Sequence, residues 1–392
     1  MLERAVMQIA SRSTERATRW RRRGVALVAV VSLAIMLAGC WDSRPVDARD
    51  LVLAMGVSPG PHHGVTVSLA IPTPTGLVSG TSASGGGASG GGGGKPPTYV
   101  LTGSGPDMGA AIAMAQADTN RDIYLGQTQI VLFSHRLSAQ QFASAISWLA
   151  RLGPFDKTAF AAISEAPVAT TLAYQPVSTR LGPMYFLTLF TCTGCQTVAL
   201  RRTVWSLEMR TVTPGLSIWL PAVDAVGPNF VVRRIVAFHG DTPVVQLTPT
   251  ETLAMGYLLA HTTKATLSVP TPAGPVGVRA VHASRVNTVT WAHGRMHVHV
   301  ALSVMAIIDQ LPVSHASPTL IRDVETEVSR RLVRETLKVM TLLQRHGSDP
   351  EGFGAPLFWD DPALRPHWES IYRQATLSLS VSTTVQDVGD AT

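Results

Sequence analysis

The chain has 392 residues, which is enough for two or three domains of ordinary size. Its formal net charge of +6 arises mainly in residues 1–39, which hold seven of the 32 Lys/Arg and two of the 26 Asp/Glu. The rest of the chain is almost neutral and has no extended basic run, which excludes the basic surface of a nucleic-acid-binding protein.

Residues 1–39 are predicted to be a secretory signal. A basic cluster at residues 19–23 precedes an apolar run at residues 25–36, which is shorter than the roughly 20 residues of a membrane span. The run ends in Leu37-Ala38-Gly39-Cys40, and polar residues follow at once. This order predicts a bacterial lipobox, in which Cys40 carries lipid and begins a mature protein outside the cytoplasmic membrane. The alternative is a chance match within an ordinary signal or span.

An N-terminal α/β domain is expected over residues 40–177. Alternating apolar residues at 65–69 predict a strand, and residues 99–103 predict the strand that returns beside it. Between them, the Gly- and Ser-rich residues 76–97 predict a flexible, disordered loop. The alternative is a phosphate-binding loop, but the Walker pattern would need Gly at Ser89 and Ser or Thr at Pro96.

Helices and strands alternate through the rest of this domain. Asp107 is expected to cap a helix that runs to about Ala117. The apolar run at residues 129–134 predicts a buried strand. Ser138 and Gln141 fit a capping box at the start of the next helix. This order predicts a mixed sheet with helices on one or both faces.

Residues 178–272 are expected to form a middle domain. Pro and Thr interrupt residues 175–229 too often for elements to be assigned there. Residues 231–239 predict a strand, and residues 250–259 predict a short helix.

The middle domain contains Cys192 and Cys195, the two cysteines besides Cys40. This spacing occurs in redox pairs and in zinc half-sites. Zinc needs four ligands, and the chain has no second cysteine pair. Outside the cytoplasm we expect a small local disulfide or two free thiols.

Residues 273–392 are expected to form a C-terminal α/β domain. Residues 286–291 and 295–308 predict two strands joined by a short turn, and residues 375–388 predict the last strand. We expect an antiparallel sheet with a helix packed on it. The overall fold class is therefore predicted as α+β, with three mixed α/β domains, largely antiparallel or mixed sheets, and helices packed on them.

The helix of this last domain is long. Ser317 and Pro318 mark its start and Gly347 its end, which predicts a helix over residues 318–346. Its apolar residues recur on one face, so that face is expected to pack on the sheet. Its arginines are expected on a solvated face, with contact to anionic lipid or to a partner as the alternative.

The remaining candidates for chemistry are weak. His293, His297 and His299 lie close in sequence, but no acid or cysteine nearby would complete a metal site, so an exposed strand face is favoured. Asp360-Asp361 is typical of a turn. We find no nucleophile elbow and no H-E-x-x-H motif. We therefore predict no catalytic residue, no metal and no cofactor.

Several of these pieces, in order, resemble the Ger(x)C family of spore-germination lipoproteins. Cys40 is followed by Trp41-Asp42-Ser43-Arg44 and then by a strand that ends in Met55-Gly56-Val57. Tyr124-Leu125-Gly126-Gln127 falls where the family has an aromatic residue, Leu, Gly and His. After the long helix come Asp349-Pro350-Glu351-Gly352-Phe353-Gly354 and then Trp368. The departures are Pro45 in place of Glu, Gln127 in place of His, and the glycine-rich insertion.

The resemblance implies the C subunit of a nutrient germinant receptor, built of three mixed α/β domains and without catalytic activity. It also implies a lipid on Cys40 that tethers the protein to the outer face of the spore's inner (cytoplasmic) membrane. The implied partners are two integral-membrane subunits, one transporter-like and one larger. No cofactor is implied beyond the covalent lipid.

Two other classes of protein are alternatives. A solute-binding lipoprotein of an ABC importer would favour two doubly wound lobes around a cleft. An envelope thiol oxidoreductase would use Cys192 and Cys195. The scarcity of parallel βαβ runs speaks against the first, and the lack of a catalytic constellation speaks against the second.

Overall fold

A computed structural model describes the following parts of the chain: residue 32 and residues 45–73, 97–176, 179, 181–192, 200–226, 229–260, 266–313 and 315–388. The predicted lipobox, Trp41, Asp42, Cys195 and nearly all of the glycine-rich segment lie outside these residues. The chain divides into two compact units, residues 1–49 and 50–392. Within the described residues, no helix combines the length and the apolar character needed to cross a bilayer.

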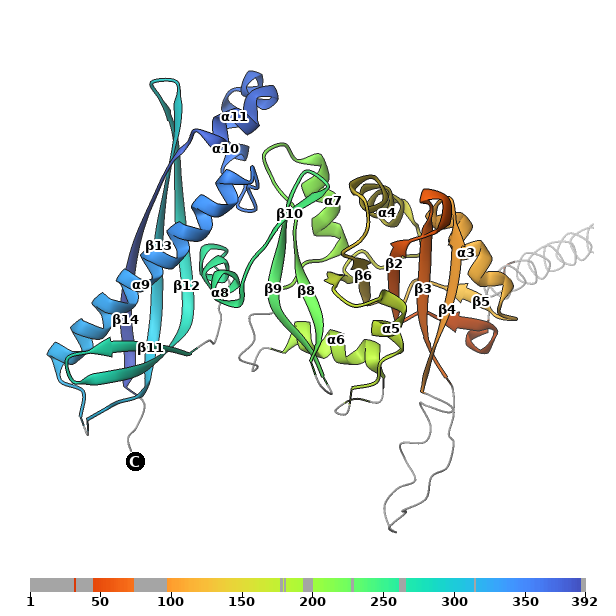
Figure 1. The fold of residues 1–392 in the computed structure, drawn as a ribbon, viewed down its shortest axis with the longest axis horizontal. Coiled ribbons are helices and arrows are strands. Elements are labelled where there is room, and N and C mark those ends of the chain that lie inside the picture. The colour runs from red at the N-terminus through yellow and green to blue at the C-terminus, as the bar shows by residue number, and fades with distance from the viewer. Residues whose placement is uncertain are drawn as a thin grey trace, which may run out of the picture. The chain divides into compact units, whose positions relative to one another are not determined.

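The first unit contributes the short helix η2 (Val46–Ala48). The second unit contains an eight-stranded mixed sheet in the order β10-β9-β8-β7-β6-β2-β3-β4 (Figure 1). Its four central strands, β8, β7, β6 and β2, run parallel, and antiparallel strands flank them on both sides. The strands are β2 (Ala54–Pro59), β3 (Val65–Pro72), β4 (Thr98–Gly105), β6 (Ile130–Ser134), β7 (Phe160–Ser164), β8 (Trp219–Val226), β9 (Asn229–His239) and β10 (Thr242–Gln246). The short strands β1 (Arg49–Leu51) and β5 (Asp122–Tyr124) form a separate pair.

Helices cover both faces of the eight-stranded sheet. α3 (Met108–Ala117), α4 (Ala139–Arg151) and α7 (Val204–Val212) pack on one face, and α5 (Val168–Ala173) and α6 (Gly182–Thr191) pack on the other. Strand β6 shows the alternation, because Val131 and Phe133 join the first core while Ile130 and Leu132 join the second. A strand buried on both faces is a continuous apolar run, and this is why β6 is predicted well.

The expected caps of α3 and α4 are confirmed. Asp107 Oδ1 accepts a hydrogen bond from the backbone N–H of Ala110 at 2.9 Å. The Ser138 hydroxyl accepts from Gln141 N–H at 3.3 Å, and Gln141 Oε1 accepts from Ser138 N–H at 3.0 Å. Gln141 Nε2 also donates to Gly64 O at 2.6 Å, so the cap ties α4 to the turn η3 (Pro61–His63) between β2 and β3.

Gly103 of β4 lies where α3 approaches the sheet closely. A Cβ at this position would lie 2.1 Å from Ala111 O and 2.4 Å from Ala115 N, both backbone atoms of α3. The helix would have to move, so we expect Gly103→Ala to lower the free energy of unfolding by about 2–3 kcal/mol. Urea denaturation measures this change. Gly153→Ala, where a Cβ meets no atom within 4 Å, is the control and should stay within about 0.5 kcal/mol of wild type; equal losses would contradict the packing argument.

The second sheet has four strands in the order β11-β12-β13-β14 (Figure 1). They are β11 (Thr266–Thr271), β12 (Gly274–Ala292), β13 (Arg295–Gln310) and β14 (Thr376–Val388). α9 (Pro318–Arg345) packs along one face, and its neighbour α8 (Pro249–Leu258) contacts α9. The predicted strand at residues 286–291 is the end of the much longer β12.

The long helix is confirmed to within one residue at its end. The Ser317 hydroxyl accepts from Leu320 N–H at 3.1 Å, and Gly347 follows the last turn with φ +66°. Three short helices, α10 (Gly354–Asp360), η4 (Pro362–His367) and α11 (Trp368–Arg373), come after it. The antiparallel prediction was wrong for the last strand, because β14 pairs with β13 in parallel. The segment with α9 returns the chain to the same end of the sheet, as a parallel pair requires.

The α+β class is confirmed, but two predicted boundaries fall inside sheets. The boundary at residues 177/178 is crossed by the pairing of β7 with β8. The boundary at residues 272/273 lies between the antiparallel neighbours β11 and β12. Strand pairing thus joins segments on both sides of each position, and the domain limits stay a prediction. Pro and Gly residues mark turns. Strand pairing joins segments that are distant in sequence, and the positions of turn residues do not reveal which strands pair.

Candidate functional site

The motif that follows α9 forms a buried loop, which we call the Asp349 loop (residues 348–354). Asp349 is 0% exposed and Phe353 is 3% exposed. The loop begins just after Gly347 and leads directly into α10. It therefore connects α9, which packs on the four-stranded sheet, with the short helices α10, η4 and α11.

The Asp349 carboxylate fixes the shape of this loop. Oδ1 accepts from Gly352 N–H at 2.9 Å, and Oδ2 accepts from Gly354 N–H at 3.2 Å. Gly352 has φ +73°, a conformation that favours glycine. Burial raises the pKa of Asp349 to about 7, although hydrogen bonds from Phe353, Gly354 and Gly352 and the nearby Arg210 favour the charged form.

The Asp349 loop is attached to the segment between α7 and β8. Ser217 N–H donates to Asp349 O at 2.8 Å, and Asp349 N–H donates to the Ser217 hydroxyl at 2.8 Å. Arg210 of α7 donates from Nη1 to Ser217 O at 2.6 Å and to Pro350 O at 3.0 Å. Burial lowers the pKa of Arg210 to about 10. One guanidinium thus holds two loops together.

A second arginine contacts the same loop from the four-stranded sheet. Arg285 of β12 forms an ion pair with Glu351, whose side chain is fully buried, and donates to Leu258 O at 2.6 Å. Burial lowers the pKa of Arg285. Removal of one partner from a buried ion pair leaves an uncompensated charge, which is strongly destabilising. The loop therefore depends on charges supplied by both α7 and β12.

An aromatic stack covers the other side of the loop. The Trp368 ring stacks on Tyr372 with centroids 5.3 Å apart and meets Phe358 edge-on at 5.2 Å. A Cβ on Gly354 would come within 2.7–2.8 Å of three atoms of the Trp368 ring. Glycine is therefore the residue that fits beneath this indole. Burial, and secondly the charge of Asp349, raises the pKa of Tyr372 well above its ordinary value.

The structure thus brings together Asp349, Phe353, Gly354 and Trp368, the four C-terminal residues that the sequence singles out. Sequence reasoning missed Arg210, Ser217 and Arg285, which hold the loop. Arg285 and Arg210 precede Asp349 by 64 and 139 positions, and no local pattern distinguishes them from exposed arginines. The cluster is a structural joint, because Asp349 and Arg210 bond neighbouring backbone groups and Arg285 pairs with Glu351.

The other candidates lie apart from this joint. His297 and His299 share a face of β13, and His299 Nδ1 and Nε2 lie 3.0 and 3.1 Å from the hydroxyls of Ser378 and Ser380. Among the described residues, no group of three or more His, Cys, Asp or Glu side chains is arranged to hold a metal ion. Cys192 is disulfide-bonded, and its pairing with Cys195 stays a prediction.

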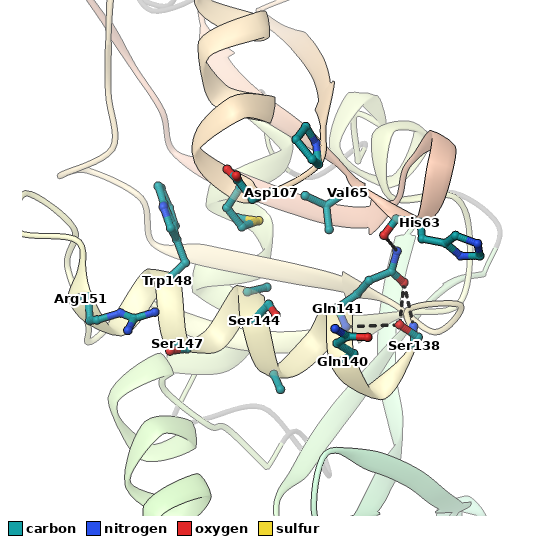
Figure 2. A pocket seen from close by; sticks show the side chains of 14 residues that line it. His63, Val65, Asp107, Ser138, Gln140, Gln141, Ser144, Ser147, Trp148 and Arg151 are labelled. Carbon is teal, nitrogen blue, oxygen red and sulfur yellow. Dashed lines mark hydrogen bonds between the residues drawn. The ribbon is translucent and has the colours of Figure 1, made fainter.

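An open groove of about 850 Å³ lies between α4 and the start of α3 (Figure 2). Ser144, Trp148 and Arg151 recur on one face of α4 and line it, and Asp107 lines it from the opposite side. Gln141 closes one end through its hydrogen bonds to the η3 turn. The groove mixes one indole, one cation and several small polar groups, a lining that suits contact with another macromolecule better than enclosure of a small solute.

Comparisons with known proteins place these features in context. A family model described as "Spore germination protein N-terminal domain" matches residues 42–225, and one described as "Spore germination B3/ GerAC like, C-terminal" matches residues 234–389. The chain is 25% identical over 117 residues to Spore germination protein KC of Bacillus subtilis (strain 168); the match covers 29% of this chain and 27% of that protein. The crystal structure of the GerBC protein matches with a TM-score of 0.54 and 12% identity, covering 86% of this chain and 99% of that chain, which shows a shared fold.

Proposed function

Because this chain belongs to the Ger(x)C family of spore germination proteins, we propose that it is the lipid-anchored C subunit of a nutrient germinant receptor. The family supports the role in germination. The observation that carries the anchored form is the sequence Leu37-Ala38-Gly39-Cys40 at the end of a signal-like segment. In this proposal the subunit acts by binding and assembly, without a catalytic step.

A lipid anchor has a simple physical effect on such assembly. It confines the protein to the membrane surface and so raises its effective concentration toward membrane-embedded partners. Two acyl chains anchor stably, since each buried CH₂ contributes about 0.8 kcal/mol. Modest protein contacts then suffice for a lasting complex. We propose that two integral-membrane subunits, one of them transporter-like, are these partners.

The described side chains support a role without turnover. The buried charges around Asp349 are engaged in holding the loop, as an assembly module would use them. The importer alternative expects two doubly wound lobes, whereas the second sheet here is a four-stranded sheet with β11, β12 and β13 antiparallel.

Co-purification tests the proposed assembly. We expect a C-terminally tagged chain, extracted from dormant-spore membranes in mild detergent, to retain two integral-membrane proteins, one of which has the hydropathy pattern of a transporter. Extracts of spores that carry the untagged chain are the control. Recovery of an ATPase with a permease would instead favour the importer, and recovery of no membrane protein would contradict the assembly.

A further inference from the structure

A crevice of about 380 Å³ lies at the carboxyl ends of β2, β6 and β7, away from the Asp349 loop. After β6 the chain enters α4 on one face of the sheet, and after β7 it enters α5 on the other face. Neighbouring parallel strands that lead to helices on opposite faces leave a crevice between them, and open α/β sheets bind ligands there. The volume lies at the lower end of the range for small-molecule sites.

One cation in this crevice has no partner among the residues that the structure describes. Arg136 follows β6, lines the crevice and is exposed. Its guanidinium makes no ion pair or hydrogen bond with any residue that the structure describes. By contrast, Arg210, Arg279 and Arg285 are all held by carboxylates or carbonyl oxygens. A free guanidinium at the mouth of a crevice is suited to a carboxylate or phosphate group, which it can bind through two parallel hydrogen bonds.

The wall of the crevice is rich in hydroxyl groups, contributed by Ser58, Thr66, Ser68, Thr102 and Ser134. Ser68 lies deepest among them, because it is 1% exposed and yet lines the crevice. Across the described part of the chain, its hydroxyl has no hydrogen-bond partner. The Ser68 oxygen is not among the enclosed, unpartnered side-chain atoms of the described residues, so it is reached from the crevice, where a polar solute can complete its hydrogen bonds.

The one carboxylate of the crevice's described lining is already engaged. Glu165 Oε1 accepts from Gln246 Nε2 at 2.6 Å. Its second oxygen remains an acceptor for a ligand hydroxyl. His135 lines the same edge, with Nδ1 3.2 Å from Ser164 O. The crevice thus offers a free cation at its mouth, a tethered carboxylate and a hydroxyl-lined wall.

From these groups we propose that the crevice binds a small hydroxylated organic anion. Arg136 holds the anionic group, and Ser68 and Thr102 hydrogen-bond the hydroxyls of the ligand. The volume admits a molecule of sugar-acid or sugar-phosphate size. This site is separate from the lipid anchor and does not depend on the receptor assignment.

Calorimetric titration of the full chain in detergent tests the proposal. The probes are gluconate for the carboxylate class and glucose 6-phosphate for the phosphate class, with glucose and acetate as controls. We expect at least one hydroxylated anion to bind at least about tenfold more tightly than glucose or acetate. No binding of either anion at about 10 mM, or equal binding of glucose, would overturn the proposal.

Two variants locate the binding. Arg136→Gln should weaken the affinity for the anion by at least about tenfold, whereas Arg151→Gln, which alters an exposed arginine of the α4 groove, should change it less than about twofold. Ser68→Ala should weaken affinity by about three- to tenfold while the melting temperature stays the same or rises, because the lost hydroxyl has no described partner. Unchanged affinity in Arg136→Gln, or a lowered melting temperature in Ser68→Ala, would refute the assignment.

Discussion

Replacement of Asp349 by Ala is expected to lower the free energy of unfolding by about 3–5 kcal/mol. The change removes the acceptor of the buried backbone N–H groups of Gly352 and Gly354 and leaves the buried Arg210 without the carboxylate that favours its charged form. Urea denaturation measures the loss. Asp360→Ala, which alters an exposed acid at the end of α10, is the control and should change the free energy by less than about 0.5 kcal/mol. Similar losses in both variants would contradict the role of the Asp349 loop.

The same carboxyl group gives the stability a defined pH dependence. Its pKa is about 7 in the folded chain, against about 3.9 when unfolded, so the folded state binds the proton more tightly between these values. The stabilisation is complete below about pH 4 and is lost as the pH rises to about 7. Asn at position 349 does not titrate. We therefore expect the free energy of unfolding of wild type, measured relative to that of Asp349→Asn, to decline by up to about 4 kcal/mol as the pH rises over this range. A rise with pH would show that Arg210 and the backbone amides hold the charged form instead.

Cys40→Ala is expected to abolish membrane attachment and nutrient germination together. Without the thiol there is no acceptor for the lipid, so the chain should stay unprocessed or be released. Fractionation of spore membranes and a nutrient-germination assay measure the two effects. Ser43→Ala, which leaves Leu37-Ala38-Gly39-Cys40 intact, should behave as wild type. A Cys40→Ala chain that stays on the membrane and germinates normally would refute the anchor.

Local signals of the fold are well predicted from the sequence. The Ser138–Gln141 capping box, the Asp107 cap and the helix after Ser317 each depend on side chains within four residues of the atoms they bond. The apolar run of β6 is equally clear, because both faces of that strand are covered. Such features can be predicted because they depend mainly on residues that are close together in the sequence.

Features that depend on distant pairing were not predictable. α6, α7 and β8 lie in the segment that Pro and Thr interrupt, and only their packing on the eight-stranded sheet reveals them. The attachment of Ser217 to Asp349 spans 132 residues. The crevice beside Arg136 likewise needs β2, β6 and β7 in one sheet before its lining exists. Composition and periodicity do not show which distant segments of the chain come into contact.

The parallel place of β14 beside β13 has a consequence for biosynthesis. His297 and Thr376, which face each other in this pair, lie 79 positions apart, so β13 is synthesised well before the strand that covers its flank. Until then the backbone N–H and C=O groups on this edge of β13, a strand that contains Val298, Val300 and Leu302, are unpaired and can pair with a strand of another chain. A nascent or clipped molecule that lacks β14 is therefore expected to aggregate, and pairing with β14 protects this edge of the sheet.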